Sequence, residues 1–354
     1  MSSRRFDALA GTLLGAALGD AIGLPREGLS RRRAARMLGP VVGHRLWLGR
    51  GMISDDTEHA CMTGQALLAS GGAPARLARS LAWRLRGWLI AGPAGVGFAT
   101  LRAIGKLWLG WSPATSGVWS AGNGPAMRAP IIGACLHGDP AALRAACAAS
   151  TRITHRDPRA EDGALAVALA AAHAARHGPA VDPAALLAEV RAGCRHDEAR
   201  RAFAGVEDAL GDPPARFAER LGLARGVTGY VLHSVPVALH AWLRRPGAFR
   251  AVVADVVELG GDTDSVGAIV GALAGTAAGV AALPGDWLGG LCDWPRSVAW
   301  MRRLAARLAA AYPDGVASGP APTVPLCWPA LAVRNPLFLA IAIGHGVRRL
   351  LPPY

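Results

Sequence analysis

The sequence Leu-Gly-Gly-Asp-Thr-Asp-Ser at positions 259–265 runs directly into an apolar segment of small residues, 266–279, and the chain is organised around it. The apolar segment predicts a buried helix, whose N-terminus these residues would form. One capping Asp, Thr or Ser is enough to satisfy the free N–H groups there. The second of the carboxylates Asp262 and Asp264 therefore indicates a function beyond folding.

A matching acidic cluster, Ser54-Asp55-Asp56-Thr57, lies far upstream and opens a predicted helix from Glu58 to Leu68. Each cluster offers two carboxylates and a hydroxyl, which are hard oxygen donors suited to Mg²⁺ or Mn²⁺. If the clusters meet, four negative charges converge and oppose folding unless cations neutralise them. Two divalent cations would balance this charge, and a pair of ions is a common catalytic arrangement.

The composition favours an all-α fold. Of the 354 residues, 52% are hydrophobic, whereas only 6% are aromatic and 18% are charged. This composition is typical of closely packed helices joined by Gly/Pro turns, and more than ten helical patterns are present. No stretch alternates with period two for long enough to require a strand.

The formal charge of +13 would normally suggest nucleic acid or an acidic membrane surface as a partner. Nearly every base is an arginine, however, and only Lys106 is a lysine. The arginines are also dispersed, apart from Arg31-Arg32-Arg33 and short pairs. We therefore expect no nucleic-acid partner, and an anionic ligand explains the charge equally well.

The cysteines indicate a reduced protein. The six are scattered without a C-x-x-C pair, so neither a disulfide framework nor a zinc site is expected. Cys61 and Cys147 lie in apolar helical patterns and are predicted to be buried free thiols. The N-terminal region has no convincing cleavage site, so we expect no signal peptide and a cytoplasmic protein.

The N-terminal half contains further candidate elements. Residues 8–18 predict a helix with small residues that packs closely against its neighbours. A predicted Gly/Pro loop follows at Gly19–Gly28, which is either a turn with Asp20 as its cap or a mobile loop that places Glu27 over a ligand site. Predicted helices at 75–91 and 96–108 carry three tryptophans expected in the core, namely Trp83, Trp88 and Trp108.

Three later segments add candidate ligand contacts. Gly122-Asn123-Gly124 precedes Pro125 at a predicted helix start, where free backbone N–H groups form an anion cradle. His155 precedes an Ala-rich helix capped by Thr154 or Asp157, and is either a structural histidine or a ligand contact. Tyr230 starts a predicted buried helix that extends to Trp242.

The C-terminal region differs from the rest. Residues 318–325 resemble a linker, and the apolar run 336–343 after them is too short for a transmembrane span. This run would dock on the core, contact a partner subunit, or lie at a membrane surface with Arg348-Arg349 reaching the headgroups.

Taken together, six motifs resemble the ADP-ribosylglycohydrolase family, in the family's order and over roughly residues 6–310. They are G-D-A-I-G-L-P-R-E-G at 19–28, S-D-D-T at 54–57, G-N-G-P-A-M-R at 122–128, T-H-R-D-P-R-A at 154–160, G-Y-V at 229–231 and G-G-D-T-D-S at 260–265. The resemblance implies an all-helical, orthogonally packed catalytic domain, 1–315, with a central cleft for two Mg²⁺ or Mn²⁺. Residues 316–354 would be a linker and an apolar extension without a counterpart in the family core.

The resemblance also implies roles for individual residues. The metal ligands would be Ser54, Asp55, Asp56, Asp262, Asp264 and Ser265, with serine at two positions where relatives more often have threonine. Glu27 matches a mobile-loop glutamate that reaches the metals, and Glu27, Asp55 and Asp262 are the candidates for the catalytic base. Substrate contacts would come from Gly122, Asn123 and Gly124 at the diphosphate and ribose, from His155, and from Tyr230 on the adenine.

The implied reaction is hydrolysis of the bond between ADP-ribose and an acceptor on an ADP-ribosylated substrate. Protein arginine is the first expectation for the acceptor, because the most similar bacterial motifs belong to arginine-specific members. Serine-linked and nucleic-acid-linked ADP-ribose are alternatives. A non-catalytic ADP-ribose-binding protein is a further one, although such a protein has no physical reason to keep four converging carboxylates.

Overall fold

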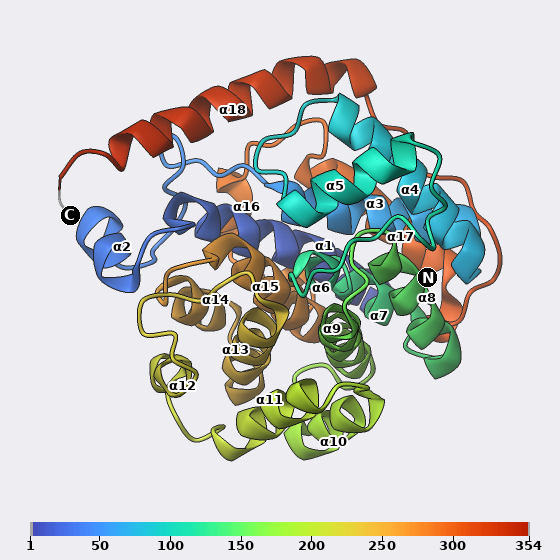
Figure 1. The fold of residues 1–354 in the computed structure, drawn as a ribbon, viewed down its shortest axis with the longest axis horizontal. Coiled ribbons are helices and arrows are strands. Elements are labelled where there is room, and N and C mark those ends of the chain that lie inside the picture. The colour runs from blue at the N-terminus through green and yellow to red at the C-terminus, as the bar shows by residue number, and fades with distance from the viewer. Residues whose placement is uncertain (1–2, 353–354) are drawn as a thin grey trace.

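A computed structural model describes residues 3–352, and helices supply the regular structure of this region. Between residues 3 and 352 no β-strand forms, and only isolated bridging pairs occur. The predicted all-α class is therefore confirmed. In Figure 1, α1 and α18 run across the view, whereas α9 is seen close to end-on, so the helices cross at steep angles. The helices are α1 Ser3–Gly23, α2 Arg31–Leu38, α3 Asp55–Ser70, α4 Pro74–Ile90, α5 Phe98–Trp108, α6 Gly124–Met127, α7 Pro130–Leu136, α8 Pro140–Arg152, α9 Pro158–His177, α10 Pro183–Gly193, α11 Asp197–Asp208, α12 Pro214–Arg220, α13 Val231–Arg244, α14 Phe249–Val257, α15 Thr263–Ala278, α16 Gly285–Gly290, α17 Val298–Ala311 and α18 Leu331–Arg348.

The centre of the molecule is the pair α1 and α15, which approach closely because glycines line both facing surfaces. A Cβ atom added at Gly11, Gly15 or Gly19 would lie 2.0, 2.2 or 1.9 Å from a backbone oxygen of α15. The Thr263 hydroxyl donates to the carbonyl of Gly23 at 2.8 Å, which ties the end of α1 to the start of α15. This contact brings the acidic start of α15 beside the loop that carries Glu27.

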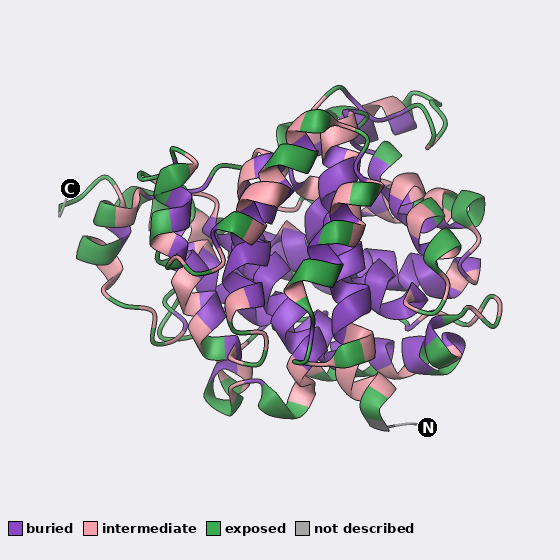
Figure 2. Ribbon diagram, turned by 90° about the horizontal axis from the view of Figure 1, so that it is seen from below, coloured by how far each residue is buried: buried purple, intermediate pink, exposed green. Residues whose placement is uncertain are grey.

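The remaining helices surround this pair and bury it. In Figure 2 the central helices are almost entirely buried, whereas exposed residues lie on the outer helices and loops. Helices α3, α7, α9, α13, α14 and α17 contact one or both central helices. Cys61 and Cys147 are free and buried in this core, which confirms the prediction of buried free thiols.

Two predictions for the N-terminal half are wrong. Asp20 does not lie in a loop, because α1 continues to Gly23 and the loop begins only after it. Of the three tryptophans predicted in the core, only Trp88 is buried, while Trp83 and Trp108 have exposed fractions of 66% and 49%. The guanidinium of Arg86 lies over the rings of both exposed tryptophans, and these cation–π contacts stabilise the rings at the surface.

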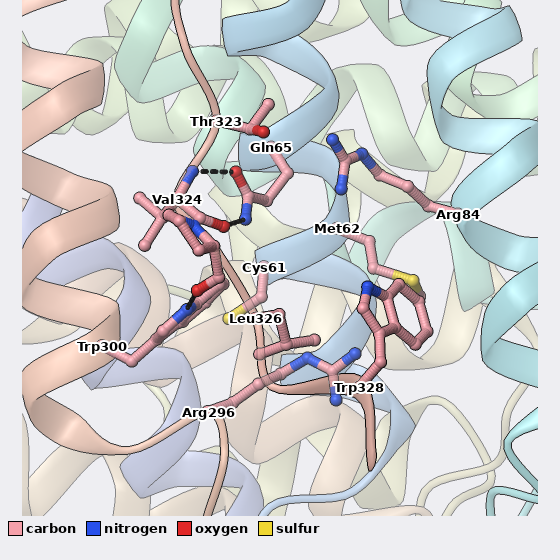
Figure 3. A pocket seen from close by; sticks show the side chains of 11 residues that line it. Cys61, Met62, Gln65, Arg84, Arg296, Trp300, Thr323, Val324, Leu326 and Trp328 are labelled. Carbon is pink, nitrogen blue, oxygen red and sulfur yellow. Dashed lines mark hydrogen bonds between the residues drawn. The ribbon is translucent and has the colours of Figure 1, made fainter. Parts of the chain in front are cut away.

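The segment after α17 crosses the body in an extended conformation before α18. The side chain of Gln65 donates to the carbonyl of Val324 at 2.6 Å and accepts from its N–H at 2.9 Å. The indole of Trp300 donates to the carbonyl of Pro325 at 2.8 Å, and Figure 3 shows these contacts beside a pocket of about 270 Å³. Residues that the sequence predicted as a linker are thus fixed to the core.

Helix α18, Leu331–Arg348, is longer than the apolar run 336–343 that the sequence shows. Arg334 and Asn335 do not interrupt it, because both side chains are buried and bonded to the body. The region Trp328–Arg348 therefore has the length and composition of a membrane-crossing helix, and so does Arg4–Arg26. The prediction that the C-terminal apolar segment is too short to span a membrane was wrong. The window of Arg4–Arg26 is 94% buried, as in a core helix, and that of Trp328–Arg348 is 28% buried. Length and composition do not separate a span from a surface helix, and membrane or subunit contact through this segment stays a prediction.

Candidate active site

The first side of the site is the N-terminus of α3, where residues other than Asp55 and Asp56 satisfy the backbone. Asp20 accepts hydrogen bonds from the N–H groups of Ser54 and Thr57, at 2.9 and 3.2 Å, and from the Thr57 hydroxyl. The Ser54 side chain accepts from the N–H of Asp56 at 3.3 Å. Asp55 and Asp56 are therefore not needed as caps, and Oδ1 of Asp56 is buried without a hydrogen-bond partner.

The second side is the N-terminus of α15, which depends on the glycine pair before it. Gly260 and Gly261 have φ values of 76° and 83°, a conformation that favours glycine. A Cβ atom on Gly261 would lie 1.9 Å from the carbonyl oxygen of Val227. Gly261 also donates to the carbonyl of Leu29 and accepts from Gly28, both at 2.8 Å. The backbone here thus positions Asp262 and the Glu27 loop together.

The two acidic clusters meet. The hydroxyl of Ser265 donates to Oδ2 of Asp56 at 3.3 Å, and that of Ser54 donates to the same oxygen at 3.2 Å. The side chain of Asp262 does not cap its own helix, but accepts from the amide of Asn123 at 2.6 Å. The helix starts that the sequence singled out therefore form one acidic surface.

These residues line a single cavity of about 290 Å³. Its lining includes ten of the predicted site residues, namely Glu27, Asp55, Asp56, Gly122, Asn123, Gly124, His155, Asp262, Asp264 and Ser265. Ser54 does not line the cavity, but its hydroxyl donates to Asp56, which does. Tyr230 does not line the cavity: its hydroxyl donates to Glu198 at 2.5 Å, although its backbone pairs with Gly122. The predicted contact of Tyr230 with adenine stays a prediction.

The cavity concentrates carboxylates that repel one another, and Arg349 offsets part of this repulsion at Glu27 and Asp264. Burial, followed by repulsion from Asp55, Asp20 and Asp262, raises the pKa of Asp56 well above its ordinary value. Burial and repulsion from Glu27 and Asp56 do the same for the pKa of Asp264. The pKa of Glu27 is also raised, by burial and by Asp262. A cation bound here would relieve both the repulsion and the cost of burial.

The residues fit a hard divalent cation by their chemistry. Among residues 3–352, no group of three or more His, Cys, Asp and Glu side chains is arranged as a complete metal-binding cluster. The donors are nonetheless oxygens, the set that Mg²⁺ and Mn²⁺ prefer. Asp56 Oδ1 is a buried acceptor with no partner, which an ion would satisfy.

His155 forms another part of the wall and is neutral. Burial and the nearby Arg128 lower its pKa to about 3. Its Nδ1 lies 2.9 Å from the hydroxyl of Thr154, which Arg128 also contacts at 2.8 Å. Gly122 and Gly124 make room for the ring, since a Cβ atom on either would lie 3.0 or 3.2 Å from it.

Sequence reasoning missed three parts of the site. Asp20 was predicted only as the cap of a turn, although it caps α3 from another helix. Arg128, at the end of the G-N-G-P-A-M-R motif, is fully buried and supports Thr154. Phe98 and Thr100 line the cavity from α5, and nothing in the sequence distinguished them from core positions.

The fold and this acidic cavity define the class of protein. Residues 1–316 match the model of the family described as ADP-ribosylglycohydrolase. The chain belongs to this family, which confirms the resemblance drawn from the six motifs. It is a hydrolase of glycosyl bonds that acts on ADP-ribose linkages.

Individual relatives agree with this assignment. The ADP-ribosyl-[dinitrogen reductase] glycohydrolase of Rhodospirillum rubrum is 28% identical over 291 residues, which are 80% of this chain and 90% of that protein. An uncharacterized protein of Archaeoglobus fulgidus is 30% identical over 79% of this chain and 90% of its own length. A solved structure described as an ADP-ribosylglycohydrolase-related protein complex has a TM-score of 0.67 and 28% identity, and covers 87% of this chain and 98% of that one.

Proposed function

We propose that the enzyme hydrolyses the bond between ADP-ribose and an arginine side chain of a protein, with the help of divalent cations. The observation that carries this proposal is the convergence of five carboxylates, Glu27, Asp55, Asp56, Asp262 and Asp264, on one cavity. Two divalent cations would balance the four aspartates, and Glu27 is a fifth carboxylate that attracts a cationic guanidinium acceptor more strongly than a neutral serine linkage or an anionic nucleic acid. The Rhodospirillum rubrum relative, whose name describes an ADP-ribosylated protein substrate, gives further support.

Asp55, Asp56, Asp262 and Asp264, with the hydroxyls of Ser54 and Ser265, would hold two Mg²⁺ or Mn²⁺. Bound cations would supply positive charge for the ribose hydroxyls and for a polarised water. Asn123 fixes the orientation of Asp262 through its 2.6 Å hydrogen bond. Asp20 fixes the start of α3, so that Asp55 and Asp56 keep their positions without capping.

The remaining chemistry belongs to the carboxylates. Cleavage of a ribosyl bond passes through a state with positive charge on the sugar, which nearby carboxylates stabilise. Water forms the new bond to the anomeric carbon as the bond to the acceptor nitrogen breaks. A carboxylate takes the proton of that water, and the departing nitrogen gains a proton. Glu27, Asp55 and Asp262 are the candidates for this base.

Synthetic peptides with arginine-linked or serine-linked ADP-ribose, together with a nucleotide-linked adduct, test this function. We expect release of ADP-ribose from the arginine peptide with Mg²⁺ or Mn²⁺, and none after chelation. Preferential cleavage of another linkage would reject the arginine acceptor, and full activity in chelator would reject the cations.

Two variants test the residues. Asp56→Asn and Asp262→Asn should each abolish cation binding in calorimetry and ADP-ribose release together. Asp208→Asn, an exposed position on α11, is the control that should change neither. Turnover that survives in both site variants would contradict the proposed metal site.

A further inference from the structure

The last helix lies outside the family match, yet its first turns hold the segment that leads into Asp55 and Asp56. The match ends at residue 316, whereas α18 covers Leu331–Arg348. Arg334 is 5% exposed, and its guanidinium donates to the carbonyl of Ile53 and, at 2.7 Å, to Asp293. Asp293 in turn accepts from the N–H of Ile53 at 2.9 Å. Both polar groups of the backbone at Ile53 are therefore held through α18 and its ion pair.

The other end of α18 reaches the loop that carries Glu27. The guanidinium of Arg349 donates to the carbonyl oxygen of Glu27 at 2.7 Å and to that of Pro25 at 3.3 Å. Its carbonyl accepts from the guanidinium of Arg33 on α2. His345, one turn earlier, contacts the carbonyl of Leu46. Figure 1 shows the consequence: α18 runs along one edge of the molecule and its C-terminal end lies beside α2.

The Glu27 loop is thus held from two sides. On its inner side the backbone of Gly28 donates to Gly261, next to Asp262. On its outer side Arg349 binds two carbonyl groups of the turn 24–27. A charged donor to a carbonyl is stronger than an ordinary hydrogen bond, and two such bonds from one planar group fix orientation as well as distance.

We propose that Arg349 is a positioning residue for the hydrolysis, which holds the turn 24–27 so that the Glu27 side chain stays directed at the carboxylate cluster. The inference rests on the proposed function, because Glu27 matters for catalysis only if this cavity is the active site. The C-terminal extension is accordingly part of the working enzyme, and α18 acts as a brace between Ile53, beside the first acidic cluster, and the Glu27 turn.

The chain provides a matched control for this inference. Arg348 is the neighbouring residue at the same helix end, carries the same charge and is exposed. Arg349→Ala and Arg348→Ala therefore change the net charge equally, but only the first removes the bonds to the Glu27 turn and the positive charge that acts on Glu27 and Asp264. Arg349→Lys keeps a charged donor and should therefore retain part of the wild-type protection and activity.

Two readouts are compared across the full-length variants. In Arg349→Ala we expect the amides of residues 27–29 to exchange with deuterium roughly tenfold faster, the effect of losing one charge-assisted hydrogen bond. We expect kcat for the ADP-ribosyl substrate to fall about tenfold with KM little changed, because ground-state binding is untouched. Arg348→Ala should match the wild type, and Arg349→Lys should lie between the two.

The outcomes separate the proposals. Equal exchange and equal kcat in the Arg349→Ala and Arg348→Ala variants would overturn the positioning role. Faster exchange spread evenly over α2 and α18 would also overturn it, since that is a general loss of stability. If the wild type cleaves no ADP-ribosyl substrate, the proposed function fails, and the exchange comparison still decides whether Arg349 holds the turn.

Discussion

Asp20 and Asp56 show how one residue type has two purposes within a single site. Both side chains are buried, and burial raises the pKa of each carboxyl. Asp20 uses its oxygens to accept the N–H groups at the start of α3. Asp56 keeps Oδ1 without a partner. The first residue builds the start of α3, and the second is the one that we propose binds a cation.

The affinity for divalent cations should rise with pH. The pKa of Asp20 is raised to about 7, and those of Asp55, Asp56 and Asp264 are raised well above their ordinary values. Protons therefore compete with an ion for the carboxylates of Asp55, Asp56 and Asp264 increasingly as the pH falls. Affinity then increases with pH by roughly tenfold per unit for each proton released. Calorimetry at pH 6 and 8, in buffers with different ionisation heats, measures both affinity and proton release.

Asp208→Asn is again the control, because its exposed carboxyl on α11 lies outside the site. It should leave the pH dependence unchanged. An equal affinity at the two pH values, with no proton released, would mean that the carboxylates are already ionised without cations.

Which residues the sequence identified depended on the kind of contact. Asp55, Asp56, Asp262 and Asp264 stood out because a helix start needs only one cap. Asp20 did not, because its partners lie on a different helix and no local pattern records a contact 34 to 37 positions away. Its G-D-A motif signalled importance without indicating this role.

At the scale of elements, the glycine stripe between α1 and α15 sets the geometry of the site. Gly15 faces Gly271, and a Cβ atom on Gly15 would lie 2.2 Å from the Gly271 oxygen. Small residues let two backbones approach until their carbonyls lie in contact with the opposite helix. Asp262 lies at the start of α15, and the Glu27 loop follows the end of α1 that packs against this start. The spacing of the two helices therefore determines how close the carboxylates come.

Gly15→Ala should destabilise the protein by about 1–3 kcal/mol, because the helices must separate to admit a methyl group. Gly205→Ala is the matched control: this glycine also lies within a helix, α11, and a Cβ atom there meets nothing within 4 Å. That change should be neutral or stabilise by up to about 1 kcal/mol, since alanine favours helix. Urea unfolding of both variants gives the comparison, and equal midpoints would show that α1 and α15 tolerate separation.

At the scale of the molecule, a buried ion network joins the C-terminal extension to the core. Arg334 pairs with Asp293 at 2.7 Å and lies 3.7 Å from Glu58, which also binds Arg296 and the indole of Trp88. The four charged groups are between 2% and 4% exposed at their side chains. Removing one partner of such a group leaves a buried charge without compensation.

Arg334→Met should therefore cost roughly 3 kcal/mol of stability, because Asp293 loses its cation while the size of the side chain is kept. Urea unfolding measures the loss. Arg303→Met, an exposed arginine on α17, should change the stability by less than about 0.5 kcal/mol. Similar midpoints for the two variants would indicate that the extension contributes nothing to the stability of the core.

The sequence by itself determined the helices and the two acidic helix starts. Apolar periodicity, small residues and caps such as Asp157 act within a few residues, so their signal is complete in a short stretch. Only the tertiary structure decided that Asp56 and Ser265, 209 positions apart, share one cavity and that Asp20 caps α3. It also decided that α18 continues through Arg334 to Arg348, so that Arg349 lies at the Glu27 turn. These contacts depend on the close approach of distant backbones and on buried charges finding partners, and neither condition is recorded in local sequence.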